Sequence, residues 1–351
     1  MQQQEIYQHT LDTITFYSSA TKAKIAKCML VDGIITRKKK EKDSKIYIAT
    51  KSDESIVSYA LKQDKKLVKY IERWEFVKNY KYSIEFSSDK KIEEILNKLK
   101  EDEKIKEFVY KSEYEELQRT IAYPSLMESE TAFYLKFNLV FEGMDSNGIR
   151  RWKRNPAVIY IPKGMDIIEL RFDSIENIFD VDRSKYIRML ISWLKDYLDS
   201  DATGIDLGRE IDYIKKHTKD YNMVVISQDM KFNNGGEASI GIGKDVSKKL
   251  PFIDELRTIM DNYADDLEKV PALKIALDEY IYDIIELSSY PVVAFSFEDK
   301  KFGIKIVEDY DGLGVYLVQH LSSNLLPNIG EERMNFVTRF IIDIRNIIKE
   351  I

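Results

Sequence analysis

The stretch GIRRWKRNP places four cations, Arg150, Arg151, Lys153 and Arg154, around the indole of Trp152. Lysine and arginine neutralise phosphates, and an indole can stack on a base, so this combination is typical of proteins that hold single-stranded nucleic acid. A solvated turn between strands, with a tryptophan that covers the core, would give the same pattern. The sequence therefore predicts a strand-to-strand connection that either contacts DNA or RNA or is only structural.

A second basic run, formed by Arg37, Lys38, Lys39 and Lys40, lies near the start of the chain. The first 51 residues carry 10 Lys or Arg and 5 Asp or Glu, whereas the whole chain has a net charge of −6. A basic front end on an acidic chain allows local contact with an anionic partner, but it argues against a protein that coats nucleic acid. A charged surface loop remains the alternative for this run.

The segment DIIELRFD supplies Asp166, Glu169 and Asp173 together with Arg171. In a strand, residues 169, 171 and 173 point to one face. Clustered carboxylates beside a cation can hold Mg²⁺, which activates water for phosphodiester hydrolysis. The short step from Asp166 to Glu169 fits such a centre poorly, and charge pairs across a sheet face explain the same residues. A divergent Mg²⁺-dependent nuclease is therefore the alternative function.

The chain's main glycine-rich stretch is KFNNGGEASIGIGKDVS, residues 231–247. A phosphate-binding loop needs a glycine where Ala238 stands and a hydroxyl residue where Asp245 stands. The residues NNGG accept the positive φ angles of tight turns, so the sequence predicts a hairpin and no bound nucleotide cofactor. Three widely spaced histidines and one cysteine cannot build a Cys-His metal centre, so no metal ligands are predicted either.

The periodicity of apolar residues predicts the elements around these motifs. Strict alternation in 132–141, followed by two further apolar runs, predicts three sequential antiparallel strands with one face on a core. The segments 132–141, 157–162, 166–173, 222–232, 237–243, 291–298 and 302–308 are the main predicted strands. Short strands are also predicted in 1–51. Helical spacing predicts helices in 55–80, 90–121, 184–200, 206–217, 251–287 and 331–351, with a break at Pro271.

Strands mostly follow strands in this pattern, so the predicted class is α+β, with mixed helices and mainly antiparallel sheets. A length of 351 residues predicts two domains. We expect an N-terminal α+β domain with the basic front end at 1–125. A C-terminal domain with an antiparallel sheet and a closing helix is expected at 126–351, and a further boundary is possible near residue 200.

The single cysteine, Cys28, lies in an apolar run, which predicts a buried thiol and a reducing compartment. The sequence starts without a signal-peptide pattern and contains no apolar run of the ~20 residues that span a bilayer. We therefore expect a cytoplasmic protein with no membrane partner. Missing catalytic motifs and localised basic charge favour a non-catalytic binding or adaptor subunit of a bacterial complex, with a protein partner and a nucleic-acid contact. Its composition suits a mobile-element or phage-defence setting.

Overall fold

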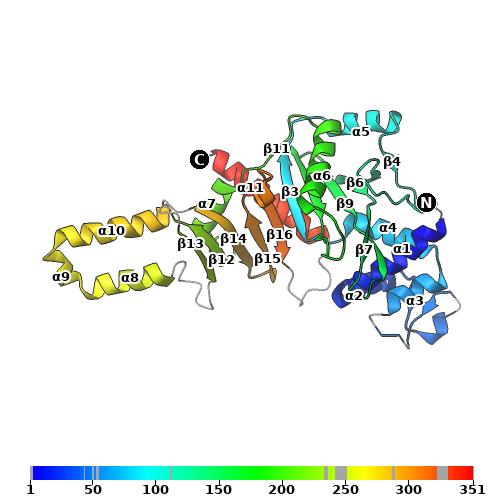
Figure 1. Cartoon of the computed structure of the whole chain (residues 1–351), viewed down its shortest axis with the longest axis horizontal. Coiled ribbons are helices and arrows are strands. Elements are labelled where there is room, and N and C mark those ends of the chain that lie inside the picture. The colour runs from blue at the N-terminus through cyan, green and yellow to red at the C-terminus, as the bar shows by residue number, and fades with distance from the viewer. Residues whose placement is uncertain are drawn as a thin grey trace. The chain divides into compact units, whose positions relative to one another are not determined.

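The computed structural model describes residues 3–42, 44–49, 51–52, 55–110, 113–232, 236–241, 251–286, 289–321 and 331–350. The predicted α+β class is confirmed, because the helices accompany a large and mainly antiparallel sheet (Figure 1). Contacts between residues divide the chain into two compact units. Unit 1 comprises Met1–Ile205 and Asn324–Val337, and unit 2 comprises Asp206–Ser323 and Thr338–Ile351. The domain boundary expected near residue 125 stays a prediction.

Unit 1 contains the N-terminal helices and the first group of strands. Its helices are α1 Gln3–Phe16, α2 Ser19–Val31, η1 Lys39–Glu41, α3 Ile56–Gln63, α4 Leu67–Val77, α5 Ile92–Glu101 and α6 Arg183–Tyr197. Its strands are β1 Ile35–Thr36, β2 Ile46–Tyr47, β3 Tyr82–Ser87, β4 Lys106–Glu107, β5 Ser125–Glu128, β6 Ala132–Phe137, β7 Val140–Met144, β8 Arg150–Arg154, β9 Ala157–Pro162, β10 Ile167–Phe172 and β11 Thr203–Gly204.

The main sheet of unit 1 has the strand order β4-β5-β6-β9-β10-β3, and β11 also pairs with β3. Its pairs are antiparallel except β4 with β5. The predicted antiparallel order of β6, β9 and β10 is confirmed, with Tyr134 opposite Tyr160 and Tyr160 opposite Glu169. Two small ladders, β1 with β2 and β7 with β8, lie outside this sheet.

The prediction that one face of these strands is buried was too narrow, because every residue of β6, β9 and β10 is buried. On one face the ring of Phe137 lies 5.1 Å from that of Trp193 on α6. On the other face Phe76 of α4 packs in a cluster with Tyr134 and Tyr160. Helices on both faces therefore bury the polar residues that alternate along the strands, and these residues must find partners.

Of the two strands predicted near the N-terminus, the one in SKIYIAT contains the short strand β2, whereas the one in LDTITFYS was wrong, because residues 3–16 are helical. Residues 3–16 form α1, which buries Ile6, Thr10 and Ile14 at a helical spacing. The alternation in LDTITFYS is short, and the same residues also fit the 3.6-residue period. Cys28 on α2 is exposed rather than buried. Of the helices predicted in 90–121, the described residues of this segment contain α5 alone, and the part from residue 106 includes the short strand β4.

Unit 2 is built on an antiparallel sheet with the order β13-β12-β14-β15-β16. Its strands are β12 Met223–Lys231, β13 Glu237–Gly241, β14 Ser289–Phe297, β15 Phe302–Val307 and β16 Leu317–Leu321. Its helices are α7 Gly208–Lys216, α8 Pro251–Asn262, α9 Ala264–Glu268, α10 Pro271–Glu286 and η2 Tyr310–Gly312. The last helix, α11 Glu331–Glu350, contributes residues to both units.

The glycine-rich stretch joins two paired strands, as the hairpin prediction requires. Strands β12 and β13 are antiparallel, and the amide of Phe232 donates to the carbonyl of Gly236 at 2.8 Å. Ala238 lies in β13. Residues 233–235 and 242–250, which include Asp245, lie outside the described residues, so the turn conformation itself stays a prediction.

The helices α8, α9 and α10 form an arm that extends from the strands of unit 2 (Figure 1). The predicted break at Pro271 is confirmed, since this proline is the first residue of α10. At the base of the arm, Ile253, Ile281 and Ile284 pack with Met230 of β12. Within the described part of the chain, no helix is both long and apolar enough to cross a membrane.

Candidate functional site

The basic run at residues 150–154 forms strand β8, which pairs antiparallel with β7, rather than the turn that the sequence predicted. The turn lies before it, where the carboxylate of Asp145 accepts hydrogen bonds from the amides of Asn147 and Ile149 at 2.9 and 3.0 Å. Gly148 in this turn has a φ of 74°, which glycine adopts without strain. The cations therefore alternate between the two sides of a ladder.

The exposed cations of β8 are paired with neighbouring carboxylates. The Nε of Arg150 lies 2.8 Å from a carboxylate oxygen of Glu142, and the Nε of Arg151 lies 2.8 Å from Asp145. The amide of Ile149 and the guanidinium of Arg151 lower the pKa of Asp145. Arg150 remains mostly exposed, so this contact is a surface ion pair that solvent screens.

The middle of β8 packs against α1. The half-buried Trp152 ring lies 4.8 Å from the ring of His9, and the guanidinium of Arg119 lies 5.1 Å over the indole. Lys153 is buried, and its ammonium contacts both carboxylate oxygens of Glu176 at 2.5 and 2.7 Å. One face of the indole is thus already occupied by a cation, as in other cation–π contacts.

Arg154, at the end of β8, is fully buried. Its Nη2 donates to Glu75 at 2.6 Å, its Nη1 lies 3.7 Å from Glu72, and the same Nη1 donates to the hydroxyl of Thr10 at 3.1 Å. Both glutamates are themselves buried on α4. A guanidinium held in this way is a structural ion pair, because its hydrogen bonds are directed at protein groups.

Lys136 of β6 extends the same buried cluster. Its ammonium lies 3.3 Å from Glu75 and 2.6 Å from Glu115, while Lys69 lies 3.0 Å from Glu72. Burial raises the pKa of Glu72. Burial also acts to raise the pKa of Glu115, but Lys136 and neighbouring hydrogen bonds bring it below its usual value. Three carboxylates and three cations, Arg154 included, balance one another in the core of unit 1.

All four cations of β8 therefore have a carboxylate within ion-pair distance. A phosphate would have to compete with these partners at Arg150 and Arg151, and Lys153 and Arg154 are buried. A nucleic-acid contact through these residues and Trp152 stays a prediction.

The second basic run lies on the loop between β1 and β2, which contains η1. Arg37, Lys38, Lys39 and Lys40 are exposed, and the ammonium of Lys38 lies 3.6 Å from Glu41. The two basic runs thus belong to different elements of unit 1. A nucleic-acid contact through this loop also stays a prediction.

The three carboxylates of the nuclease alternative have separate environments. Glu169 is buried and its carboxylate lies 2.7 Å from the guanidinium of Arg171, which also stacks on the ring of Tyr160. Asp173 pairs with Lys78, and Asp166 is exposed at the end of the strand. Among the described residues, no three His, Cys, Asp or Glu side chains are grouped so that they could hold a metal ion. The nuclease alternative stays an untested hypothesis.

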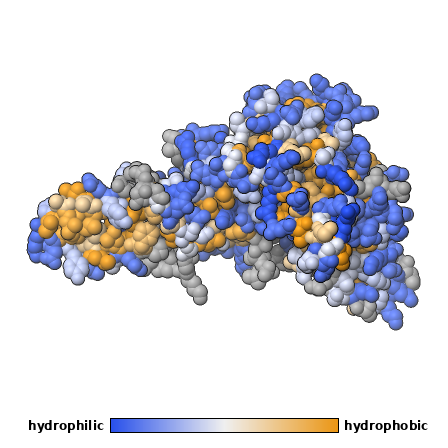
Figure 2. Space-filling model, in the orientation of Figure 1, coloured by the Kyte–Doolittle hydropathy of each residue, from blue (hydrophilic) through white to orange (hydrophobic). Residues whose placement is uncertain are grey.

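The most unusual surface that the structure describes is the arm α8–α10, which the sequence motifs did not single out. Of the 16 exposed large apolar side chains in the described residues, eight lie on this arm and its turns. They are Phe252, Ile259, Tyr263, Val270, Leu273, Ile275, Tyr280 and Tyr282. Figure 2 shows apolar surface over much of the arm. Monomeric proteins rarely expose large apolar patches to water, so this concentration of exposed apolar side chains marks a candidate interface.

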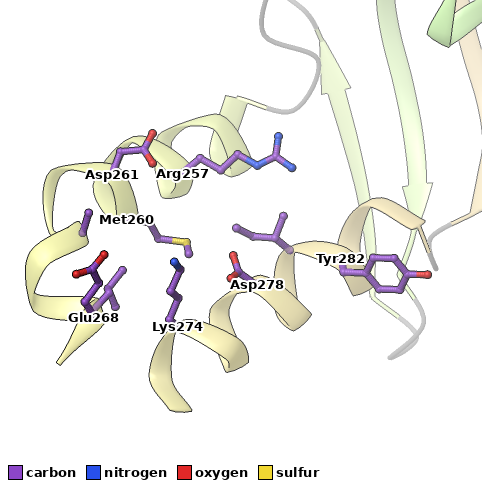
Figure 3. A pocket seen from close by; sticks show the side chains of 10 residues that line it. Arg257, Met260, Asp261, Glu268, Lys274, Asp278 and Tyr282 are labelled. Atoms are coloured by element: carbon purple, nitrogen blue, oxygen red, sulfur yellow. The ribbon is translucent and has the colours of Figure 1, made fainter. Parts of the chain in front are cut away.

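A hollow of about 540 Å³ lies between α8 and α10. Met260 of α8 and Lys274 and Asp278 of α10 point toward this space (Figure 3), and Leu267 and Ile281 also line it. Its charged lining residues, Lys274 and Asp278 among them, form no ion pair with any residue that the structure describes. The hollow is thus lined by apolar side chains and by charged side chains that are available to a ligand.

The arm is also strongly acidic. Residues 251–286 contain 10 Asp or Glu and 3 Lys or Arg, a balance of −7 against −6 for the whole chain. The sequence of α10 contains a signal for this surface. Apolar residues lie around most of the helix circumference, whereas a helix that buries one face needs an apolar stripe on that face only. Comparison of the chain with protein-family models, curated proteins and solved structures found no match.

Proposed function

We propose that this chain is a binding or adaptor subunit that docks to a partner protein through the arm α8–α10. The observation that carries this proposal is the concentration of eight exposed apolar side chains on one element group. Their burial against a partner would be favourable at about 25 cal/mol per Å² of apolar surface. At the base of the arm, Ile253 and Ile281 pack with Met230 of the unit 2 sheet, so the rest of the arm is presented to solvent.

The shape and charge of the arm favour one kind of partner. An open hollow between two helices, floored by Met260, Leu267 and Ile281, suits an amphipathic helix that lays its apolar face into a groove. The balance of −7 favours a helix whose remaining positions are basic. A second copy docked arm to arm would bring two acidic surfaces together, which is unfavourable for the same reason.

Two synthetic peptides of about 18 residues, or roughly five helical turns, test this proposal. Both carry leucines on one helical face, and the other positions are lysine in the first peptide and glutamate in the second. Fluorescence anisotropy should show saturable binding of the lysine peptide that weakens as salt rises, and no binding of the glutamate peptide. A scrambled lysine peptide of the same composition, with its leucines off one face, controls for attraction by charge alone and should not saturate.

Two tyrosines of α10 give a matched pair of variants. Tyr282 lines the hollow and is 59% exposed, whereas Tyr280 is 56% exposed and does not line it. We expect Tyr282→Lys to weaken the lysine peptide at least about tenfold and Tyr280→Lys to change it by less than about threefold, given the energies of central interface residues. Equal binding of all peptides, no binding at all, or a dimer by sedimentation that Tyr282→Lys dissociates would overturn the proposal.

The finer parts of the function remain hypotheses beside this proposal. A cytoplasmic location, a bacterial complex and a mobile-element or phage-defence setting are suggested by composition alone. Co-purification from the native host, followed by identification of the partner and of any bound nucleic acid, addresses them together. A partner whose binding segment is a basic amphipathic helix would also agree with the peptide result.

A further inference from the structure

A second hollow, of about 470 Å³, lies in unit 1 beside α6. Its lining comes from one side of α6 and from the segment that contains Tyr123, together with Lys104 after α5. The segment with Tyr123 is fixed by Gln118, whose side chain donates to the Tyr123 carbonyl at 2.7 Å and accepts from its amide at 3.2 Å. A volume of about 300–1,000 Å³ is usual for sites that bind small molecules.

The cations of this hollow differ from those of β8. Lys104, Lys185 and Arg188 line it, and none of the three makes an ion pair within the described residues. Asp196 is the one carboxylate in the lining, so the four charged side chains carry a net charge of +2. Unpaired cations that converge on a hollow favour an anionic ligand, because a phosphate need not displace a protein carboxylate.

Aromatic rings also line the hollow. The indole of Trp193 stacks on the ring of Tyr197, with centroids 5.0 Å apart and planes at 28°, and its N–H donates to the carbonyl of Ala122 at 3.0 Å. These contacts fix the indole before any ligand binds. Tyr197 is 37% exposed and Tyr123 is 47% exposed, so both can offer ring surface to a planar group.

The spacing along α6 separates Lys185 and Arg188 from Trp193 and Tyr197. Arg188 precedes Trp193 by five residues, which is about 7.5 Å along the helix axis. We propose that this hollow binds a nucleotide, with its base against the aromatic residues and its phosphate at Lys185 and Arg188. The carboxylate of Asp196, which would repel a phosphate, lies beyond Trp193 on the same helix, at the end assigned to the base. The ligand is either a free mononucleotide or one nucleotide of a single strand.

Isothermal titration distinguishes these two sources. The probes are the four nucleoside monophosphates, adenosine, inorganic phosphate and a short single-stranded oligothymidylate. A mononucleotide should bind more tightly than adenosine or phosphate alone, because it fills both ends of the hollow. Tighter binding of the oligonucleotide than of thymidine monophosphate would assign the site to single strands, and equal or weaker binding would assign it to free nucleotides.

Variants of exposed residues on α6 connect the binding to this hollow. We expect Arg188→Gln to weaken nucleotide binding about 10- to 100-fold, as expected for loss of a charged hydrogen bond. Tyr197→Leu should weaken the nucleotides while leaving inorganic phosphate unchanged. Lys195→Gln is the control, since Lys195 is exposed on α6 but does not line the hollow. No binding of any nucleotide, or binding that Arg188→Gln and Tyr197→Leu leave unchanged, would overturn the proposal.

Discussion

Two arginines of the same short strand have very different environments in this chain. Arg150 and Arg154 both belong to β8, but the side chain of Arg150 is 68% exposed and that of Arg154 is 1% exposed. Sequence alone cannot separate them, because the partners of Arg154 lie on α4, almost 80 residues earlier in the chain. The ion pair of Arg154 with Glu75 is a long-range contact, whereas Arg150 and Arg151 pair with carboxylates of the same hairpin.

The two arginines should therefore differ in their effect on stability. Arg154→Ala leaves Glu72 and Glu75 buried without their guanidinium, so we expect a loss of about 3–5 kcal/mol in the free energy of unfolding. Arg150→Ala removes a surface pair and should cost less than about 1 kcal/mol. Urea unfolding curves of the two variants measure both values. Equal losses would show that the buried cluster does not contribute as its geometry indicates.

His9 should give unit 1 a specific dependence on pH. Burial against Trp152 lowers the pKa of His9 below its usual value, although Asp12 and Glu5 oppose this shift and Arg119 and Arg154 add to it. The unfolded chain then binds the proton more readily than the folded chain. The contribution of neutral His9 is complete above about pH 6.5 and is lost as the pH falls from there toward the lowered pKa.

Thermal unfolding between about pH 7.5 and 5 tests this expectation, since that interval brackets the usual histidine pKa. The Tm of the wild type should fall more steeply with decreasing pH than that of His9→Gln, in which the titrating group is absent. His217 and His320 are present in both proteins, so they cancel in the comparison. Parallel pH profiles would contradict the assignment of the shift to His9.

At the scale of elements, the sequence predicted helices where α3 to α11 lie and strands where the longer strands lie, and it missed α1, α2 and several of the shorter strands. β6, β9, β10, β12, β14 and β15 were all expected, because long alternating or apolar runs leave few other structures. The errors lie where periodicity is short or where charges mask it, as in α1 and in residues 106–121. The buried charges of β6 and β10 were expected on a solvated face, since the helices that cover them come from distant segments.

For the arm, the sequence predicted the secondary structure but not which residues are exposed. Its helices and the break at Pro271 were predicted, but apolar residues at helical spacing normally indicate burial, so their exposure was not. A deletion of residues 258–278, replaced by a short Gly/Ser linker, should leave Ile253, Ile281 and Ile284 in place. We expect the Tm and the far-ultraviolet dichroism of the sheet to be retained and binding of the lysine peptide to be lost. Unfolding of unit 2 would show that the arm is part of its core.

At the scale of the whole molecule, two glycines offer a way to test whether the units are separate cooperative bodies. A Cβ on Gly143 would lie 2.1 Å from the carbonyl oxygen of Ile178 in unit 1, and a Cβ on Gly303 would lie 2.5 Å from that of Phe295 in unit 2. Each alanine substitution therefore forces a backbone shift in one unit. Because contacts between residues divide the chain into these two units, we expect each change to remain local.

Hydrogen exchange followed by mass spectrometry measures this directly. Gly303→Ala should raise exchange in β14, β15 and β16 and leave β6, β9 and β10 unchanged. Gly143→Ala should raise exchange in β7 and its partner β8 and leave β14, β15 and β16 unchanged. Raised exchange throughout the chain in both variants would show one cooperative body instead of two.

The charge of the arm has a consequence for the colloidal behaviour of the purified chain. Apolar surface would draw copies together, while the balance of −7 over residues 251–286 keeps them apart. Salt weakens only the repulsion, because the screening length falls from about 10 Å at 0.1 M to about 3 Å at 1 M. Concentrated salt should therefore make copies of the chain associate, and light scattering that grows with ionic strength would show that charge repulsion on the arm keeps them apart.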